Sequence, residues 1–147
     1  MNKALSYAFR LLKYRPRSEY ELRQRFKRKG FTDSVIKETF LFLKEKGFLD
    51  DREFARIWVE SRIKKPLGIY RLKQELKAKG IDKGLIEQII QRISSRYSEA
   101  EVISDLIQRR LHRLKLIEPA KAKRRIFLYL LRRGFSSEGI QEALNQI

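Results

Sequence analysis

The chain of 147 residues has 35 Lys and Arg against 18 Asp and Glu, which gives a formal net charge of +17. A soluble surface needs a net charge of only about 2 to 8, so this excess favours a polyanionic partner over mere solvation. The absence of cysteine excludes disulfide frameworks and thiolate metal sites, and no apolar run is long enough for a secretory or membrane-spanning segment, so we expect a soluble, cytoplasmic protein without a membrane partner.

The first third of the chain predicts three helices. Hydrophobic residues at helical spacing predict a helix that ends before Pro16, because proline disfavours helix for the residue that precedes it. Ser18 and Glu21 have capping-box spacing and begin a second helix, which ends at Gly30, a residue suited to a left-handed cap. A third helix is expected over residues 33–46. The hydrophobic stripe of the first helix consists of Leu5, Phe9 and Leu12.

The middle third has the same pattern. A helix begins at Asp50, whose carboxylate suits an N-cap, and is broken at Pro66. Two further helices are expected over residues 69–79 and 82–95. The side chains predicted to face the core from the first of these three helices are Phe54, Ile57 and Trp58.

The last third also predicts three helices. Ser98 begins a helix expected to run to about residue 116, and Pro119 suits the first turn of a second helix that continues to residue 133. The third helix is expected over residues 137–145. Strand-like alternation does not persist over any segment of the chain, so the fold is predicted to be all-α.

A pair formed by glycine and a hydrophobic residue recurs as Gly30-Phe31, Gly80-Ile81 and Gly134-Phe135. Hydrophobic residues stand at matching distances from each glycine, and a helix-capping residue follows two places after it. A period of about fifty residues indicates a repeat array. The recurring hydrophobic residues are Leu22, Phe26, Ile36, Phe40 and Leu43, then Leu72, Leu76, Ile86, Ile90 and Ile93, then Ile126, Leu130, Ile140, Leu144 and Ile147; the capping residues are Thr32, Asp82 and Ser136.

We therefore predict three tandem three-helix repeats that form an elongated, curved module. Their predicted boundaries are residues 1–48, 49–97 and 98–147. All three repeats are net positive, with 13 basic and 5 acidic residues in the first, 12 and 7 in the second, and 10 and 6 in the third. This distribution is typical of a protein whose whole length runs along an extended polyanion.

Basic residues gather on corresponding helices of the three repeats, which predicts a stripe of positive charge. Such a stripe can bind the phosphate backbone of DNA or an acidic protein groove, and the sequence does not separate the two. The predicted binding residues are Arg23, Arg25, Lys27, Arg28, Lys29, Arg62, Arg71, Lys73, Lys77, Lys79, Arg109, Arg110, Arg113, Lys121, Lys123, Arg124, Arg125, Arg132 and Arg133.

The chain offers little raw material for catalysis. His112, the only histidine, stands among basic residues and is interpreted as a surface residue. Helix capping explains Asp50 and Asp51 without a metal ion. The glycine motifs that cradle phosphates, GxxxxGK[ST] and GxGxxG, do not occur. We therefore predict no enzyme activity, no metal and no cofactor.

Short blocks of sequence over about residues 4–90 form a specific combination, and the C-terminal part adds a helical pattern with Arg132-Arg133-Gly134-Phe135. The blocks are Arg17-Ser18-Glu19, Glu21-Leu22, Lys29-Gly30-Phe31, Gly47-Phe48-Leu49-Asp50-Asp51, Phe54-Ala55, Trp58-Val59, Arg62, Gly68, Arg71-Leu72, Glu75-Leu76 and Lys79-Gly80-Ile81. In this combination the chain resembles the RecX family, the regulatory proteins of RecA recombinase.

The resemblance implies a monomer that binds the RecA–DNA filament along its helical groove. It implies an inhibitor that limits filament growth, RecA ATPase, strand exchange and the coprotease activity that induces the DNA-damage response. Binding to free single- or double-stranded DNA would be weak or dependent on RecA. The alternative left open by the residues themselves is a helix-turn-helix-like adaptor or transcription factor that binds duplex DNA independently of RecA.

Overall fold

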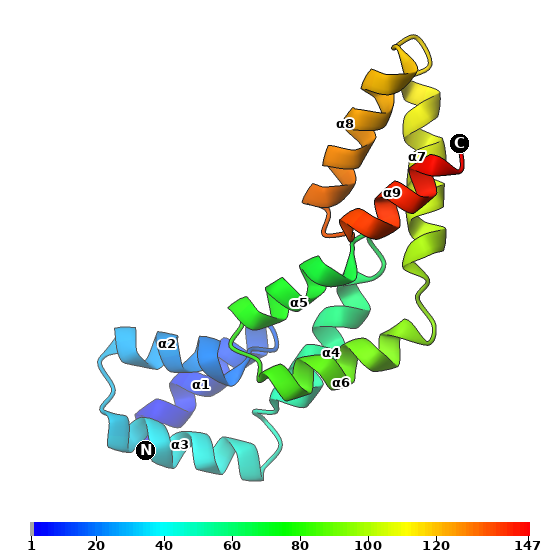
Figure 1. Ribbon diagram of the computed structural model, residues 1–147. Coiled ribbons are helices and arrows are strands. Elements are labelled where there is room, and N and C mark those ends of the chain that lie inside the picture. Colours follow the sequence, from blue (N-terminus) through cyan, green and yellow to red (C-terminus); the bar gives the residue numbers. More distant parts are fainter. Residues whose placement is uncertain (1) are drawn as a thin grey trace. The chain divides into compact units, whose positions relative to one another are not determined.

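The computed structural model describes residues 2–147, and this part of the chain contains nine helices and no strand (Figure 1). The helices are α1 (Asn2–Tyr14), α2 (Glu19–Lys29), α3 (Asp33–Glu45), α4 (Asp51–Arg62), α5 (Ile69–Ala78), α6 (Lys83–Ser94), α7 (Glu99–Arg113), α8 (Pro119–Arg132) and α9 (Ser137–Asn145). The prediction of an all-α fold built from tandem three-helix repeats is confirmed. Two helices, α4 and α7, end about three residues earlier than predicted, because turns follow Arg62 and Arg113.

The chain forms two compact units that divide the middle repeat between them. The first unit comprises the residues up to Trp58 together with Leu76–Ile86, and the second comprises Val59–Glu75 and Glu87–Ile147. Each unit thus holds one terminal repeat and the part of the middle repeat that packs with it. The predicted repeat boundaries and the curved, elongated shape stay predictions.

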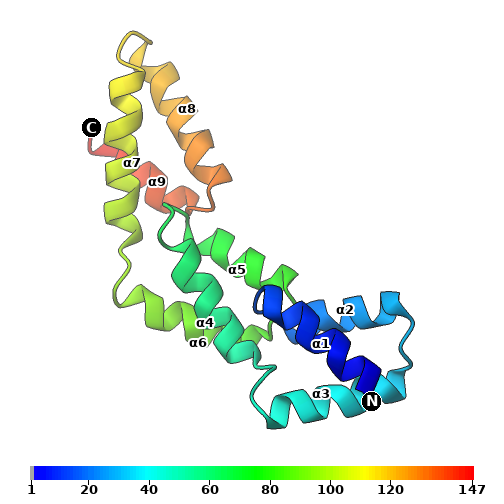
Figure 2. The same ribbon diagram turned by 180° about the vertical axis from the view of Figure 1, so that it is seen from behind.

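The core of the first repeat is built around Phe26, which is fully buried. Its ring lies 5.3 Å from the ring of Tyr7, 5.0 Å from that of Phe31 and 5.3 Å from that of Phe40. Figure 2 shows α1 lying against α2 and α3 to close this core. Helix α1 does so through Ala4 and Ala8, whose small side chains allow a close approach, and the prediction that Phe9 faces the core is wrong: it is 39% exposed.

The third repeat has an equivalent core, in which α9 crosses α7 and α8 (Figure 1). Its buried residues are Ile103, Leu106, Ile107, Ile126, Leu130, Phe135, Ile140 and Leu144. The predicted core position Ile147 is 45% exposed, because α9 ends at Asn145 and the residue lies beyond the last helical turn. The other recurring hydrophobic positions are all buried, as predicted.

Each repeat turns from its second to its third helix through the predicted glycine. Gly30, Gly80 and Gly134 have φ of 97°, 75° and 89°, and the predicted capping side chains of Thr32, Asp82 and Ser136 accept backbone N–H groups of the helix that follows. In the middle repeat Phe54 and Val59 are buried, but Ile57 is 38% exposed and its predicted core position is wrong. The buried residues of α4 are Phe54, Ala55 and Val59, and Ile57 lies outside this buried face of the helix.

Within the first unit, the start of α2 is bound to the middle repeat by side-chain contacts. The Ser18 hydroxyl donates a hydrogen bond of 2.7 Å to the Lys79 carbonyl, and the Asp51 carboxylate accepts the Glu19 N–H at 2.8 Å. Ser18 is fully buried and also caps α2, so one side chain serves both the helix and the junction.

Within the second unit, the start of α5 is bound to the third repeat in the same way. The Gly68 N–H donates to the Arg133 carbonyl at 2.8 Å, and the Glu99 carboxylate accepts the Ile69 N–H at 2.7 Å. Asp51 and Glu99 are the first residues of α4 and α7. The first helix of each following repeat therefore caps the second helix of the repeat before it.

Candidate polyanion interface

The last turn of α2 presents exposed cations. Arg25, Lys27, Arg28 and Lys29 are exposed and make no ion pair in the part of the chain that the structure describes. Their charges complement the negative C-terminal end of the helix dipole, which favours cations at this position. Arg23 differs, because it pairs with Glu19 at 3.1 Å. The end of α2 thus offers net positive charge to a partner.

A hollow of about 560 Å³ lies between α2 and α3, and both cations and the carboxylates of Glu19 and Asp33 line it. Its α3 side contributes Lys37 and Lys44, which sequence reasoning did not include among the binding residues; Lys44 pairs with Glu19 at 2.9 Å, whereas Lys37 has no ion pair among the described residues. They lie seven residues apart, a spacing that places both on one face of a helix and that could have identified them. The exposed side chain of Leu41 and the ring of Phe40 also line the hollow.

The basic residues near α5 are largely neutralised by internal carboxylates. Arg62 donates from Nε and Nη2 to Glu75 at 2.9 and 2.7 Å, and Arg71 Nε lies 3.4 Å from the same carboxylate. Lys73 pairs with Glu87 at 3.4 Å. Of the residues predicted on α5, Lys77 remains exposed and without an ion pair among the described residues. The predicted stripe is therefore weaker in the middle repeat than its count of basic residues suggests.

Lys79 belongs to a partly buried network in the first unit. It donates to Glu21 at 3.0 Å, and the same carboxylate accepts two hydrogen bonds from Arg15 and one from the Ser18 N–H. Burial raises the pKa of Glu21, but these donors outweigh it and hold the pKa at about 2. Lys79 and Glu21 thus stabilise the junction between the first two repeats.

This network predicts a pH-dependent contribution to stability. Since the folded-state pKa of Glu21 is depressed to about 2 from 4.5, its contribution is present above about pH 5 and is lost as the pH falls toward 2. We expect Glu21→Gln to lower the free energy of unfolding by about 1–2 kcal/mol at pH 7, after allowance for partial solvent screening, and by almost nothing at pH 2. Urea unfolding at several pH values measures the difference.

The matched control is Glu38→Gln, which neutralises an exposed carboxylate on α3 that forms no ion pair among the described residues. It should leave the stability of the protein nearly unchanged at every pH. A loss for Glu21→Gln that stays constant from pH 7 to pH 2 would contradict the network.

Helix α8 and its C-cap carry the largest group of cations without a carboxylate partner among the described residues. Within residues 2–147 no carboxylate pairs with the six basic residues of α8 and its C-cap. They are Lys121, Lys123, Arg124, Arg125, Arg132 and Arg133. On α7, Arg113 is exposed and unpaired among the described residues, whereas Arg109 pairs with Asp105 at 3.0 Å.

Tyr129 organises the arginines between α7 and α8. The guanidinium of Arg110 lies 3.6 Å from the centre of its ring, and Arg133 Nε donates to its hydroxyl at 2.8 Å. Burial raises the pKa of Tyr129, but the hydrogen bonds from Arg110 and Arg133 outweigh it and lower the pKa below its ordinary value. This cluster borders a hollow of about 280 Å³ that Arg125 and Arg132 also line.

Sequence models of RecX match all three repeats: the first three-helix domain over residues 4–43, the second over 50–90 and the third over 98–144. The chain belongs to the RecX family. A regulatory protein RecX from Chlorobium phaeobacteroides is 36% identical over 99% of this chain and 93% of its own length. A second, from Caldanaerobacter subterraneus, is 30% identical over 97% of this chain and 69% of its own length.

Solved structures of RecX proteins share the fold. A crystal structure of a regulatory protein RecX has a TM-score of 0.84 at 21% identity and covers 99% of this chain and 73% of its own. The crystal structure of RecX from Lactobacillus salivarius has a TM-score of 0.85 at 21% identity. The match covers 99% of this chain and 94% of the Lactobacillus chain. The tandem three-helix architecture of this RecX chain is thus shared with members of low sequence identity.

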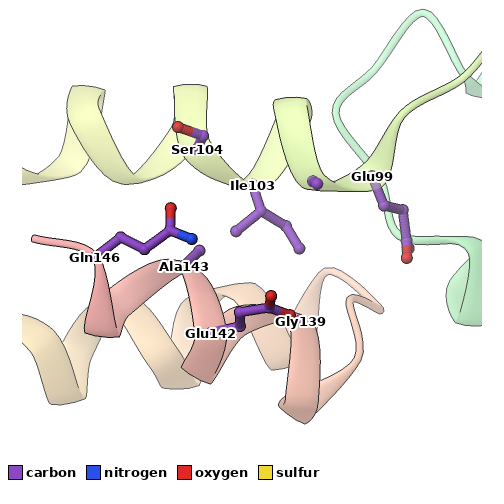
Figure 3. A pocket seen from close by; sticks show the side chains of 8 residues that line it. Glu99, Ile103, Ser104, Gly139, Glu142, Ala143 and Gln146 are labelled. Carbon is purple, nitrogen blue, oxygen red and sulfur yellow. The ribbon is translucent and has the colours of Figure 1, made fainter.

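A second hollow of the third repeat, about 300 Å³ between α7 and α9, is unsuited to an anion (Figure 3). Glu99 and Glu142 line it, and none of its lining residues is Lys or Arg. Glu99 already accepts the Ile69 N–H, so its place is explained by the junction. This hollow therefore offers no cation to a polyanion.

Asp50 and Asp51 act as helix caps: Asp50 caps α4, and Asp51 accepts the Glu19 N–H at the start of α2. Asp50 accepts the N–H groups of Arg52 and Glu53 at 3.0 and 3.3 Å. In the range 2–147 no cluster of three His, Asp or Glu side chains is placed to hold a metal ion, and His112 is exposed. None of the described helices has the length and apolar character needed to cross a membrane.

Proposed function

We propose that this RecX-family chain inhibits RecA by binding along the helical groove of the RecA–DNA filament. The match of RecX models to all three repeats carries the proposal. The partner and the direction of regulation follow from the resemblance to regulators of RecA. Filament growth, ATPase, strand exchange and coprotease activity would all fall when the filament is occupied, and occupancy needs no catalytic group.

The distribution of unneutralised charge supports binding to a polyanionic assembly. Cations at the end of α2 and along α8 lack internal carboxylates, so they are free to contact phosphates or acidic side chains of the filament. Three covalently linked repeats also raise the effective concentration of each for the next contact. Individually weak contacts would then give stable occupancy, and free DNA would be bound more weakly than the filament.

The direct test is co-sedimentation of the protein with RecA, with and without single-stranded DNA, together with RecA ATP turnover. We expect the protein to pellet with the filament and to lower ATP turnover in proportion to its occupancy. Strong binding to one duplex sequence without RecA would instead favour the helix-turn-helix alternative. Binding to the filament with unchanged turnover would reject inhibition.

Charge reversal tests which residues engage the filament. The paired change Lys121→Glu and Arg124→Glu on α8 should weaken filament binding about tenfold or more at fixed salt, because both cations lack internal partners. The matched control reverses Lys64 and Lys65, two exposed cations outside the predicted set, and changes the net charge equally. Equal losses in both variants would show a response to net charge alone and contradict the assignment to α8.

A further inference from the structure

The middle repeat holds a carboxylate between two arginines. Arg62 binds Glu75 through two hydrogen bonds, at 2.9 and 2.7 Å, and Arg71 approaches the same group at 3.4 Å. The side chains of Arg62 and Glu75 are only 22% and 18% exposed. The paired geometry is the arrangement in which a guanidinium binds a carboxylate most strongly.

The third repeat keeps the two arginines but has no carboxylate at the matching position. Arg62 and Arg110 are each the twelfth residue of the first helix of their repeat, α4 and α7. Arg71 and Arg125 each stand nine residues before the glycine of the turn. Five residues before that glycine, where the middle repeat has Glu75, the third repeat has Tyr129.

Helices α4 and α7, the first helices of the middle and third repeats, occupy equivalent places in the structure. Asp51 begins α4 and Glu99 begins α7, and each accepts the first N–H of the second helix of the preceding repeat. Arg62 and Arg110 therefore occupy equivalent places. At the position where the middle repeat has the carboxylate of Glu75, the third repeat has the phenol of Tyr129.

Tyr129 contacts Arg110 without supplying a carboxylate to it. The Cζ atom of Arg110 lies 3.6 Å from the centre of the Tyr129 ring, a cation–π contact, whereas a carboxylate would bind the N–H groups of the guanidinium. Arg110, Arg125 and Arg132 border the hollow of about 280 Å³, and no acidic residue lines it. None of these three arginines has a carboxylate partner among residues 2–147. We name this hollow the Tyr129 pocket.

We propose that the Tyr129 pocket takes an Asp or Glu side chain of a protein partner, with a neighbouring apolar side chain of that partner against Leu114 and Leu128. The proposal rests on the proposed function, in which the partner is the RecA protein of the filament. Because three arginines and no carboxylate line the pocket, we expect its occupant to be negatively charged. Leu128 is 43% exposed, so it offers apolar surface beside the arginines, and Arg and Tyr are enriched at protein–protein hot spots. A DNA phosphate would leave the leucines without a partner.

The decisive variant is Tyr129→Glu, which supplies the carboxylate internally as the middle repeat does. We expect it to fold and to weaken co-sedimentation with RecA filaments about tenfold or more, since the arginines are then occupied. Tyr129→Phe keeps the stacked ring and should stay within about threefold of the parent. The charge control is Gln108→Glu, an exposed position on α7 outside the pocket, which should have little effect.

Two further probes distinguish the outcomes. A fluorescent single-stranded oligonucleotide, measured without RecA, should bind Tyr129→Glu and Gln108→Glu equally; a loss restricted to Tyr129→Glu would assign the pocket to DNA phosphate and overturn the proposal. A labelled peptide of alternating Glu and Leu pairs should bind the parent and not Tyr129→Glu. If the parent binds the peptide, Tyr129→Glu does not, and the parent fails to pellet with RecA filaments, the proposed function would be rejected and the assignment of the pocket would stand. Unchanged filament binding by a folded Tyr129→Glu variant would overturn the inference alone.

Discussion

Replacing Gly80 by Ala is expected to lower the free energy of unfolding by about 3 kcal/mol or more, a large part of the stability of a domain of this size. Gly80 has φ of 75°, where a residue with a Cβ pays about 1 kcal/mol or more. The added Cβ would also overlap the Cβ of Tyr20 and lie 2.6 Å from its Cγ. Tyr20 is anchored on α2, so relief requires the first two repeats to move apart.

The matched control is Gly30→Ala. Gly30 has the same kind of backbone, with φ of 97°, but nothing lies within 4 Å of a Cβ built there. Its loss should therefore reflect backbone strain alone, about 1 kcal/mol. Calorimetric melting of both variants separates the two effects, and equal losses would show that the contact between Gly80 and Tyr20 does not tie the repeats together.

The elements within each repeat were predictable because their signals are local. Hydrophobic spacing around Gly30, Gly80 and Gly134, with a capping residue two places later, defined the second and third helices and nearly all their core positions. Two errors came from α1 and α4, where Phe9 and Ile57 share helical spacing with true core residues. Hydrophobicity does not show that small alanines on α1 bring that helix close to its neighbours.

The junctions between repeats could not be predicted, because they join a side chain to a backbone group far along the chain. The Ser18 hydroxyl meets a carbonyl 61 residues away, and Asp51 meets an N–H group 32 residues away. Neither contact produces a periodic pattern that can be recognised in a single sequence. Asp51 was recognised as a capping residue, but the helix that it caps is α2, in another repeat.

The sequence predicted which basic residues belong to the candidate interface, but it did not predict which of them are neutralised by a carboxylate in the fold. Clusters of Lys and Arg on α2, α5 and α8 are visible in the sequence, yet their carboxylate partners are set by packing. Glu75 neutralises cations of the middle repeat, whereas α8 has no such partner among the described residues. The three repeats therefore present different amounts of free charge from similar numbers of basic residues.

Replacing Phe26 by Ala is expected to cost about 3–5 kcal/mol, because it removes a fully buried ring and leaves a cavity among three aromatic neighbours. Urea unfolding followed by circular dichroism measures the loss, and Trp58, the only tryptophan, reports on the same unit by fluorescence. A variant within 1 kcal/mol of the parent would show that the first repeat collapses around the vacancy and that its core is not held by Phe26.

The chain itself supplies the conservative counterpart, Phe26→Leu. The other two repeats have Leu76 and Leu130 at this position, both fully buried. If volume and burial dominate, Phe26→Leu should cost only about 1–1.5 kcal/mol, since the register of the repeat already accommodates leucine. A loss as large as that of Phe26→Ala would instead show that the rings of Tyr7, Phe31 and Phe40 are arranged around an aromatic partner, because an aliphatic side chain then leaves their edge and face contacts unmet.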